Sequence, residues 1–310
     1  MKVIYMGTAD FAREPLEKIA QKHEVVAVVS QPDKPNSKRG LSVVFSPVKN
    51  YAVDNGITVY QPLNISSEES IDFLSSLGAD IIIVCAYGQV VKKNVLELTK
   101  YGCYNIHASI LPKYRGAAPI HRAIIDGNKK SGVSIMKMAE GLDTGDVLLI
   151  KETEIGENMN IGELHDTLKS IGAEAILEAM EQIENQTAVY TKQDEESSTY
   201  AQKIYKEECF IDFNFDAQIV HNKIRGLNPF PTAKTRFGGK MIKLYDCYKT
   251  TIAHNKKSGT ILDVNKDGII IACKSDAVVV KRLQPEGKKQ MDAVAFFRGL
   301  RGEGEVLFGE

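Results

Sequence analysis

Short apolar runs alternate with amphipathic segments through the first half of the chain. Runs at residues 2–6, 25–30 and 81–85 are rich in Val and Ile and show no period of two, which is typical of strands buried on both faces of a parallel sheet. Further strands are predicted at residues 102–107, 132–138 and 146–150. Helical spacing of apolar residues predicts helices at residues 11–21, 47–55 and 66–77. The alternation predicts right-handed crossovers and an open α/β sheet.

The pattern changes near the middle of the chain. Apolar residues at helical spacing from Leu164 to Ile183 predict a helix that closes a first domain near Asn185. Residues 186–199 are polar and have the composition of a linker. A short helix predicted at 216–225 precedes a series of short strands separated by Gly, Asn and Asp turns. These strands are predicted at residues 240–248, 259–263, 268–273 and 277–283.

Length and composition support two globular domains. A chain of 310 residues approaches the limit of a single hydrophobic core. We predict an α/β domain over 1–185, a linker over 186–203 and a small OB-like antiparallel barrel over 204–310. With 43% hydrophobic and 25% charged residues, the composition excludes collagen-like and disordered classes. No apolar run approaches the roughly 20 residues of a membrane-spanning helix, and the first is too short for a signal peptide, so we expect a cytoplasmic protein.

Charge is distributed unevenly along the chain. The formal net charge is only -1, yet residues 221–290 carry 15 Lys and Arg against 5 Asp and Glu. A basic module beside an acidic one indicates that the C-terminal part meets a polyanion, with an incidentally biased solvated surface as the alternative.

Asn105 and His107 are the first candidates for chemistry. They lie two residues apart at the end of a predicted strand, so their side chains share one face at the edge where α/β sheets bind ligands. An amide can donate to a developing oxyanion, and an imidazole exchanges protons near neutral pH. A purely structural hydrogen-bonded pair is the alternative.

Asp143 is the third candidate. It lies in the Glu140–Asp146 turn between two predicted strands, where the glycines let the backbone present a carboxylate that could orient and charge His107. The alternative is that Asp143 only forms the turn. Ser109 is not predicted as a nucleophile, because no Gly-x-Ser-x-Gly elbow surrounds it. Five scattered cysteines without a Cys-x-x-Cys pair, and histidines without ligand spacing, lead us to expect neither disulfides nor a bound metal.

These residues carry a family resemblance. The run from Ser109 to Ile120 after Asn-x-His, with Leu-Asp-Thr-Gly-Asp at 142–146, resembles the folate-dependent formyltransferases. The match covers nearly the whole chain and is widest to members that act on methionyl-tRNA. Further matching segments are 7–11, 31–35, 46–49, 86–88, 199–201 and 224–229.

The resemblance implies a fold and an activity. It implies a Rossmann-like domain that binds 10-formyltetrahydrofolate and an OB-like domain that helps hold tRNA. The expected reaction moves the formyl group to the α-amine of initiator methionyl-tRNA and releases tetrahydrofolate. The resemblance further implies a monomer that needs no metal ion and does not bind a membrane. Asn105 and His107 would steady the oxyanion, and Asp143 would assist proton movement. The implied folate-lining residues are Ser109, Ile110, Leu111 and Pro112. The implied tRNA-binding residues, on an insertion loop, are Lys34, Lys38 and Arg39.

Two other functions remain open at this stage. A relative that formylates a nucleotide-linked amino sugar would share Asn-x-His and the Asp143 turn, whereas a silent RNA-binding protein would share only the basic region. The loop reads Asn-Ser-Lys-Arg-Gly at 36–40 instead of the family's Gly-Arg-Gly-like core. The principal RNA contact can therefore be either Lys38 or Arg39.

Overall fold

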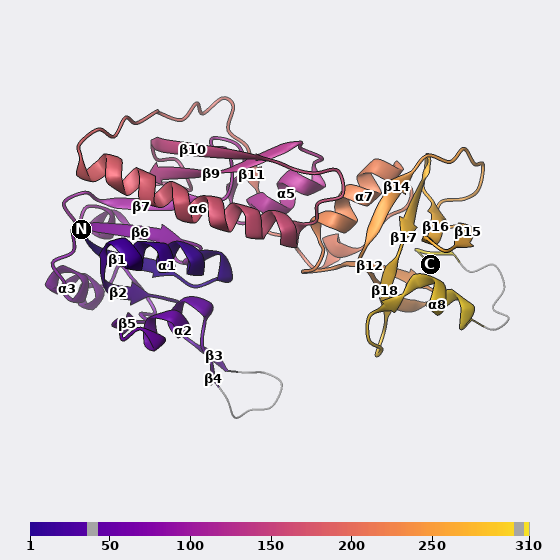
Figure 1. Ribbon diagram of the computed structural model, residues 1–310, viewed down its shortest axis with the longest axis horizontal. Coiled ribbons are helices and arrows are strands. Elements are labelled where there is room, and N and C mark those ends of the chain that lie inside the picture. The colour runs from indigo at the N-terminus through magenta and orange to yellow at the C-terminus, as the bar shows by residue number, and fades with distance from the viewer. Residues whose placement is uncertain (36–42, 301–306, 310) are drawn as a thin grey trace. The chain divides into compact units, whose positions relative to one another are not determined.

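The computed structural model describes residues 1–35, 43–300 and 307–309 (Figure 1). The chain forms two compact units that interleave along the sequence. The first, called here the N-terminal unit, comprises Met1–Gly116, Ser131–Thr153 and His165–Tyr200. The second, called here the C-terminal unit, comprises Ala117–Lys130, Glu154–Leu164 and Ala201–Glu310. Two segments that precede residue 165 in the sequence thus belong to the C-terminal unit.

A seven-stranded sheet forms the centre of the N-terminal unit, in the order β10-β9-β7-β6-β1-β2-β5. Strands β5, β2, β1, β6 and β7 run parallel, and β9 is antiparallel to β7. The bounds are β1 Lys2–Gly7, β2 Glu24–Val29, β5 Val59–Tyr60, β6 Ile81–Cys85, β7 Cys103–His107, β9 Lys130–Lys137 and β10 Val147–Glu154. Strands β1, β6 and β7 are almost wholly buried, as unbroken apolar runs predict.

Helices cover both faces of this sheet. Ile4 and Ile82 on one face pack with Leu74 of α3 (Glu68–Ser76) and with α4 (Lys93–Leu96). On the other face lie α1 (Arg13–Lys22) and α6 (Ile161–Glu184) (Figure 1). Gly172 of α6 permits this packing, because a Cβ there would lie 3.1 Å from the side chain of Ile106.

Local details of the N-terminal unit differ from the predictions. A 3-10 turn at Asp10–Ala12 precedes α1, and α2 spans Pro47–Asp54. Helix α3, predicted over 66–77, begins after Ser67, whose hydroxyl caps it by accepting a hydrogen bond from the Ser70 amide. The segment after Pro112 is not an exposed loop. Arg115 is fully buried, and Pro119 begins a helix, at a position where its missing N–H costs no hydrogen bond.

The C-terminal unit combines two helices from distant parts of the sequence with two antiparallel sheets. Helix α5 (Pro119–Ile125) packs on α7 (Ala217–Gly226), where a Cβ at Gly226 would lie 2.6 Å from Ile125. One sheet has the order β12-β13-β18-β19 and the other β14-β17-β16-β15. Their bounds are β12 Ala233–Phe237, β13 Lys240–Leu244, β14 Cys247–Thr250, β15 Ile261–Asn265, β16 Gly268–Ala272, β17 Ala277–Val280, β18 Arg282–Pro285 and β19 Met291–Asp292. Helix α8, Ala293–Arg298, follows.

One strand pair runs through both sheets. The Tyr245 amide donates to Arg282, and the Lys281 amide donates to Asp246, so β13–β18 pairing continues into β14–β17. The segments predicted as single strands over 240–248 and 277–283 are therefore each divided by a bend. The prediction of antiparallel strands is confirmed here, while a closed OB-like barrel stays a prediction.

Two expectations about the whole chain can be compared with the structure. The five cysteines are free thiols, and four are buried. Burial raises the pKa of Cys85 and Cys103 to about 12, so neither is a thiolate at neutral pH. None of the helices within the described ranges is both long and apolar enough to cross a bilayer.

Candidate active site

Strand β7 places Asn105 and His107 on one face of the sheet. Cys103 of the same strand packs toward α3 and α4, whereas Ile106 faces α6, so alternation puts Asn105 and His107 on the α3 side. His107 ends the strand at the carboxyl edge of the parallel sheet, and it pairs with Ser134 of β9. Both side chains therefore have the placement that the sequence predicts.

The turn between β9 and β10 brings Asp143 to these two residues. Asp143 has a positive φ of 53°, and a Cβ on nearby Gly145 would overlap the Lys137 carbonyl oxygen. Asp143 Oδ1 lies 3.4 Å from Asn105 Nδ2, and Oδ2 lies 3.7 Å from His107 Nδ1. The Asp143 side chain is 12% exposed and that of His107 is 7% exposed. The three predicted catalytic residues thus form one cluster.

The backbone after β7 completes the surroundings of the cluster. His107 Nε2 lies 3.0 Å from the carbonyl oxygen of Tyr114, which can only accept, so Nε2 carries a proton. The Gly116 amide donates to Asp143 Oδ2 at 2.8 Å. A proton on Nδ1 would lie between the imidazole and the Asp143 carboxylate.

The predicted folate-lining residues lie beside the cluster. The Ser109 hydroxyl donates to the Lys113 carbonyl oxygen at 2.6 Å. Its proton therefore points to a backbone carbonyl group and not to a basic side chain that could activate it as a nucleophile. Leu111 is buried against Met136 and Val147, while Ile110 and Pro112 are partly exposed. A role of Ser109–Pro112 in lining a folate pocket stays a prediction.

The base of the predicted tRNA-binding loop is a short hairpin. Lys34 lies in β3 (Lys34–Pro35), which pairs with β4 (Val43–Val44), whereas Lys38 and Arg39 fall outside the described residues. Asp33 before the hairpin forms an ion pair with Lys49 and accepts from Gln61. Burial alone would raise the pKa of Asp33, but these two bonds lower it overall, so the carboxylate stays charged at neutral pH.

Sequence reasoning missed two residues behind the cluster, Arg115 and Gln193. Both are buried, and Arg115 donates two hydrogen bonds to Gln193 Oε1, at 2.9 and 3.1 Å. Arg115 lies in the run that carries the family resemblance, but Gln193 lies in the segment predicted as a linker. The feature that marks this pair in the structure is the burial of an arginine. The sequence of a polar segment does not show whether its side chains are buried.

One group of possible metal ligands occurs where side chains are described: Asp10, His165 and Asp166. The Lys169 ammonium lies 3.1 Å from Asp10 and 3.5 Å from Asp166. Because the Lys169 ammonium already neutralises part of the charge of both carboxylates, these three residues do not indicate a bound metal cation.

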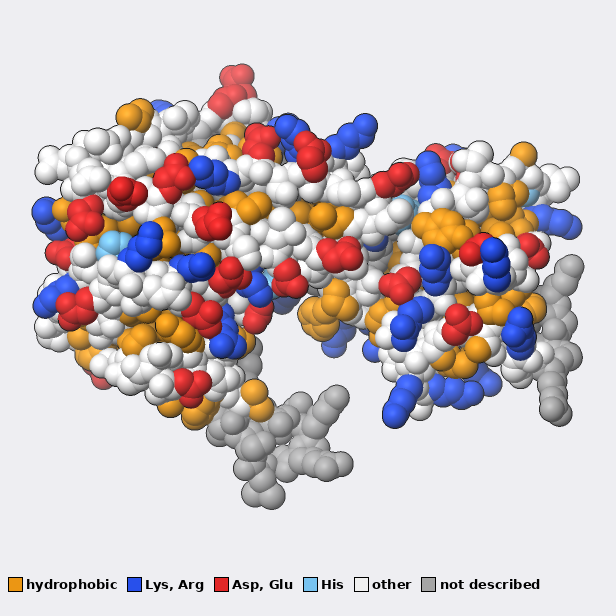
Figure 2. All heavy atoms as spheres, viewed as in Figure 1, with side chains coloured by type: hydrophobic (Ala, Val, Ile, Leu, Met, Phe, Trp, Pro, Cys, Tyr) orange, Lys and Arg blue, Asp and Glu red, His pale blue; other side chains and the backbone are white. Residues whose placement is uncertain are grey.

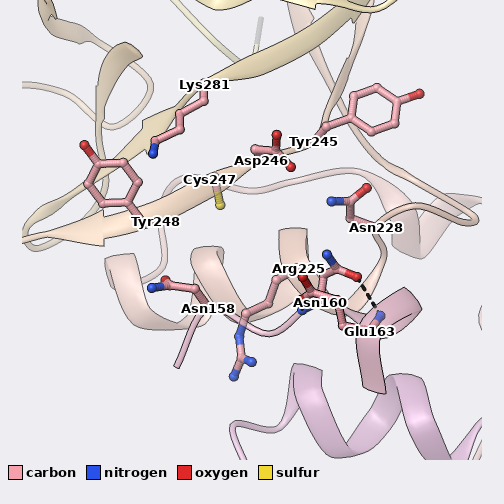
Figure 3. A pocket seen from close by; sticks show the side chains of 10 residues that line it. All are labelled: Asn158, Asn160, Glu163, Arg225, Asn228, Tyr245, Asp246, Cys247, Tyr248 and Lys281. Carbon is pink, nitrogen blue, oxygen red and sulfur yellow. Dashed lines mark hydrogen bonds between the residues drawn. The ribbon is translucent and has the colours of Figure 1, made fainter. Parts of the chain in front are cut away.

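The C-terminal unit contains a cavity of about 490 Å³ (Figure 3). Lys281 lies 4.9 Å above the Tyr248 ring on one side of it, and Asn160 accepts from the Glu163 amide on the other. The Arg225 guanidinium is already bound by Asn222 and by the carbonyl oxygens of Gly156 and Met159. Unlike the Asn105 cluster, the residues lining this cavity do not include an amide, an imidazole and a carboxylate together.

Comparison with known proteins gives these features a family. The formyl transferase model matches residues 1–180, and the formyl transferase C-terminal domain model matches residues 203–301. The chain belongs to the formyl transferase family. A methionyl-tRNA formyltransferase from Lachnospira eligens is 43% identical over 316 residues, covering 100% of both chains. The family resemblance predicted from the sequence is confirmed, and so is formyltransferase activity as the enzyme class.

Solved structures share the fold of this formyl transferase. An N-formyltransferase from Helicobacter canadensis, in complex with folinic acid and dTDP-3-aminofucose, matches with a TM-score of 0.67 and 21% identity, covering 92% of this chain and 99% of that one. HypX from Aquifex aeolicus, in complex with tetrahydrofolic acid, also has a TM-score of 0.67 at 16% identity, covering 100% of this chain and 50% of that one. The predicted α/β class with a Rossmann-like N-terminal domain is confirmed.

Proposed function

We propose that the chain transfers the formyl group of 10-formyltetrahydrofolate to the α-amine of initiator methionyl-tRNA, which gives N-formylmethionyl-tRNA for translation initiation. The observation that carries the proposal is the largely enclosed Asn105–His107–Asp143 cluster at the carboxyl edge of the sheet, in which His107 is buried and the other two side chains are half-buried. The full-length identity of 43% to a methionyl-tRNA formyltransferase supports the choice of acceptor.

A reduced folate is the proposed donor. Two structural neighbours were solved with folinic acid and with tetrahydrofolic acid. We assign the pocket for 10-formyltetrahydrofolate to Ser109, Ile110, Leu111 and Pro112, which follow His107 directly in the chain. This placement would bring the formyl carbon to the polar cluster.

The cluster provides the groups that acyl transfer requires. The lone pair of the α-amine forms a bond to the formyl carbon, and the carbonyl electron pair moves onto oxygen. Asn105 Nδ2 and a protonated Nδ1 of His107 would donate hydrogen bonds to that oxyanion, because Nε2 of His107 already donates to the Tyr114 carbonyl oxygen. The carbon–N10 bond then breaks, and N10 takes up a proton while the amine loses one. Asp143, whose carboxylate lies beside Nδ1 of His107, assists this proton transfer.

The tRNA is assigned to the basic parts of the chain. Lys and Arg side chains are numerous on the surface over the C-terminal strands (Figure 2). Together with Lys34, Lys38 and Arg39 of the N-terminal loop, they would contact the phosphates of an acceptor stem. We further propose that the enzyme acts in the cytoplasm as a monomer. Light scattering would measure its mass in solution and test the oligomeric state.

The competing acceptor is a nucleotide-linked amino sugar, because the H. canadensis neighbour was solved with dTDP-3-aminofucose. We expect transfer of a labelled formyl group from 10-formyltetrahydrofolate to methionyl-tRNA and no detectable transfer to dTDP-3-aminofucose. The measurement is acid-precipitable label on tRNA beside chromatography of the sugar nucleotide. Label on the sugar alone would replace the proposed acceptor, and tRNA binding without transfer to either would identify a silent RNA-binding protein.

A further inference from the structure

A buried chain of hydrogen bonds extends from the catalytic cluster to the polar segment at residues 193–199. Gln193 Nε2 lies 2.8 Å from the backbone oxygen of Asp143 and 2.7 Å from that of Gly145. Only 6% of Gln193 is exposed, so water cannot replace it at those two carbonyl groups. The amide therefore holds the backbone of the turn that presents Asp143.

Arg115 determines which way this amide faces. Its Nε and Nη2 both donate to Gln193 Oε1, so the oxygen must point to the guanidinium and the nitrogen to the turn. Arg115 also makes a bidentate pair with Glu195, with both N–O distances at 2.8 Å. The hydrogen bonds that Arg115 donates to Glu195 raise the pKa of Arg115, which stays charged and polarises the amide.

The same segment holds the backbone that contacts His107. The Thr199 carbonyl oxygen accepts from the Arg115 amide at 2.8 Å, and the Thr199 hydroxyl accepts from the Tyr114 amide at 2.8 Å. The Tyr114 carbonyl oxygen in turn contacts His107. Residues 114–116 thus have one side on the catalytic cluster and the other on the 193–199 segment.

Asp143 requires such support. Its φ of 53° lies in the left-handed region, which an Asp adopts only when the surroundings compensate the cost. Without the two hydrogen bonds from Gln193, the backbone carbonyl groups of Asp143 and Gly145 would lose their buried donor. The backbone of the turn would then shift, and the Asp143 carboxylate would shift with it. A displacement of about 1 Å at a catalytic carboxylate can cost 10²-fold in rate.

We propose that Gln193, oriented by Arg115, is a positioning residue for formyl transfer, because it fixes the Asp143 carboxylate beside Asn105 and His107. It touches no substrate and acts through the Asp143 turn. The inference rests on the proposed function of the cluster, and it assigns a catalytic task to a segment whose composition is that of a linker.

The test is the isosteric Gln193→Glu variant in the full-length protein. A carboxylate can still accept from Arg115, but it cannot donate to the two carbonyl groups. We expect kcat for methionyl-tRNA formylation to fall about 10-fold or more while KM for 10-formyltetrahydrofolate changes less than about 3-fold. The matched control is Gln186→Glu, the same change at an exposed position, which should keep the wild-type rate.

A double-mutant cycle with Asp143→Asn separates positioning from general damage. Because Gln193 acts through Asp143, Gln193→Glu should cost less than about 3-fold in the Asp143→Asn background. Equal losses in both backgrounds would overturn the proposal, as would an unchanged kcat. If Gln193→Glu does not fold, Gln193→Met, which removes the donor without adding charge, takes its place in the same cycle.

A measurement that does not depend on enzyme activity tests this inference separately from the proposed function. The Gly116 amide donates to Asp143 Oδ2, so its hydrogen exchange, followed by NMR, should accelerate at least about 10-fold in Gln193→Glu and not in Gln186→Glu. Unchanged exchange would contradict the positioning role even in an active enzyme. A wild-type protein that formylates no methionyl-tRNA would instead refute the proposed function.

Discussion

Replacing His107 or Asn105 by Ala should lower kcat for formyl transfer by roughly 10²-fold or more, the usual scale for an acid–base group or an oxyanion donor. Such a loss corresponds to about 2.7 kcal/mol of transition-state stabilisation. The His107 variant loses the imidazole donor beside Asp143, and the Asn105 variant loses the amide donor. Steady-state formylation of methionyl-tRNA at saturating 10-formyltetrahydrofolate measures both effects.

Folding must be intact for this comparison. Neither residue belongs to the apolar core, so the circular dichroism spectrum of each variant should match that of the wild type. His165→Ala, which removes a partly exposed histidine from α6, is the matched control and should retain near-wild-type kcat. A folded His107→Ala or Asn105→Ala enzyme with near-wild-type turnover would refute the assigned role.

Affinity for tRNA should fall steeply as salt rises, because each phosphate contact releases condensed counterions. Replacing Lys38 and Arg39 together by Ala should raise KM for methionyl-tRNA and flatten the slope of log affinity against log salt by about two units. Folate binding should not change, because the folate pocket is assigned to Ser109–Pro112. A salt titration of tRNA binding, with parallel folate binding, measures both effects.

The control for this titration removes two other positive charges. Lys18 and Lys22 are exposed on α1, and their double Ala variant should keep the wild-type slope. If the Lys38 and Arg39 variant also kept the wild-type slope and affinity, the loop would not contact tRNA phosphates. The amino-sugar acceptor would then become the stronger candidate.

The sequence predicts most of the N-terminal sheet because its strands are buried on both faces. An unbroken run such as residues 81–85 can then be recognised without any knowledge of its neighbours. The two-residue strand β5 leaves too short a signal to be recognised. The bend at Tyr245 was missed for another reason, because residues 240–250 contain no Pro and no internal Gly that would mark a break in the strand.

The clustering of Asn105, His107 and Asp143 could be predicted because residue type and local position both indicated it. Asn105 and His107 lie at a strand end, and glycines flank Asp143 in a turn between two strands. The support behind the cluster was not predictable. Gln193 and Arg115 are 78 residues apart, and a polar segment has the same composition whether it is solvated or packed against a site.

The most direct test of the account is a single-turnover measurement of formyl transfer to methionyl-tRNA by the wild type and by Asp143→Asn, with both substrates saturating. This variant keeps the size of the side chain and removes the negative charge that lies 3.7 Å from Nδ1 of His107. The account predicts transfer by the wild type and a rate lower by roughly 10²-fold in the variant, with unchanged affinity for the folate. Equal single-turnover rates in the two proteins would contradict it.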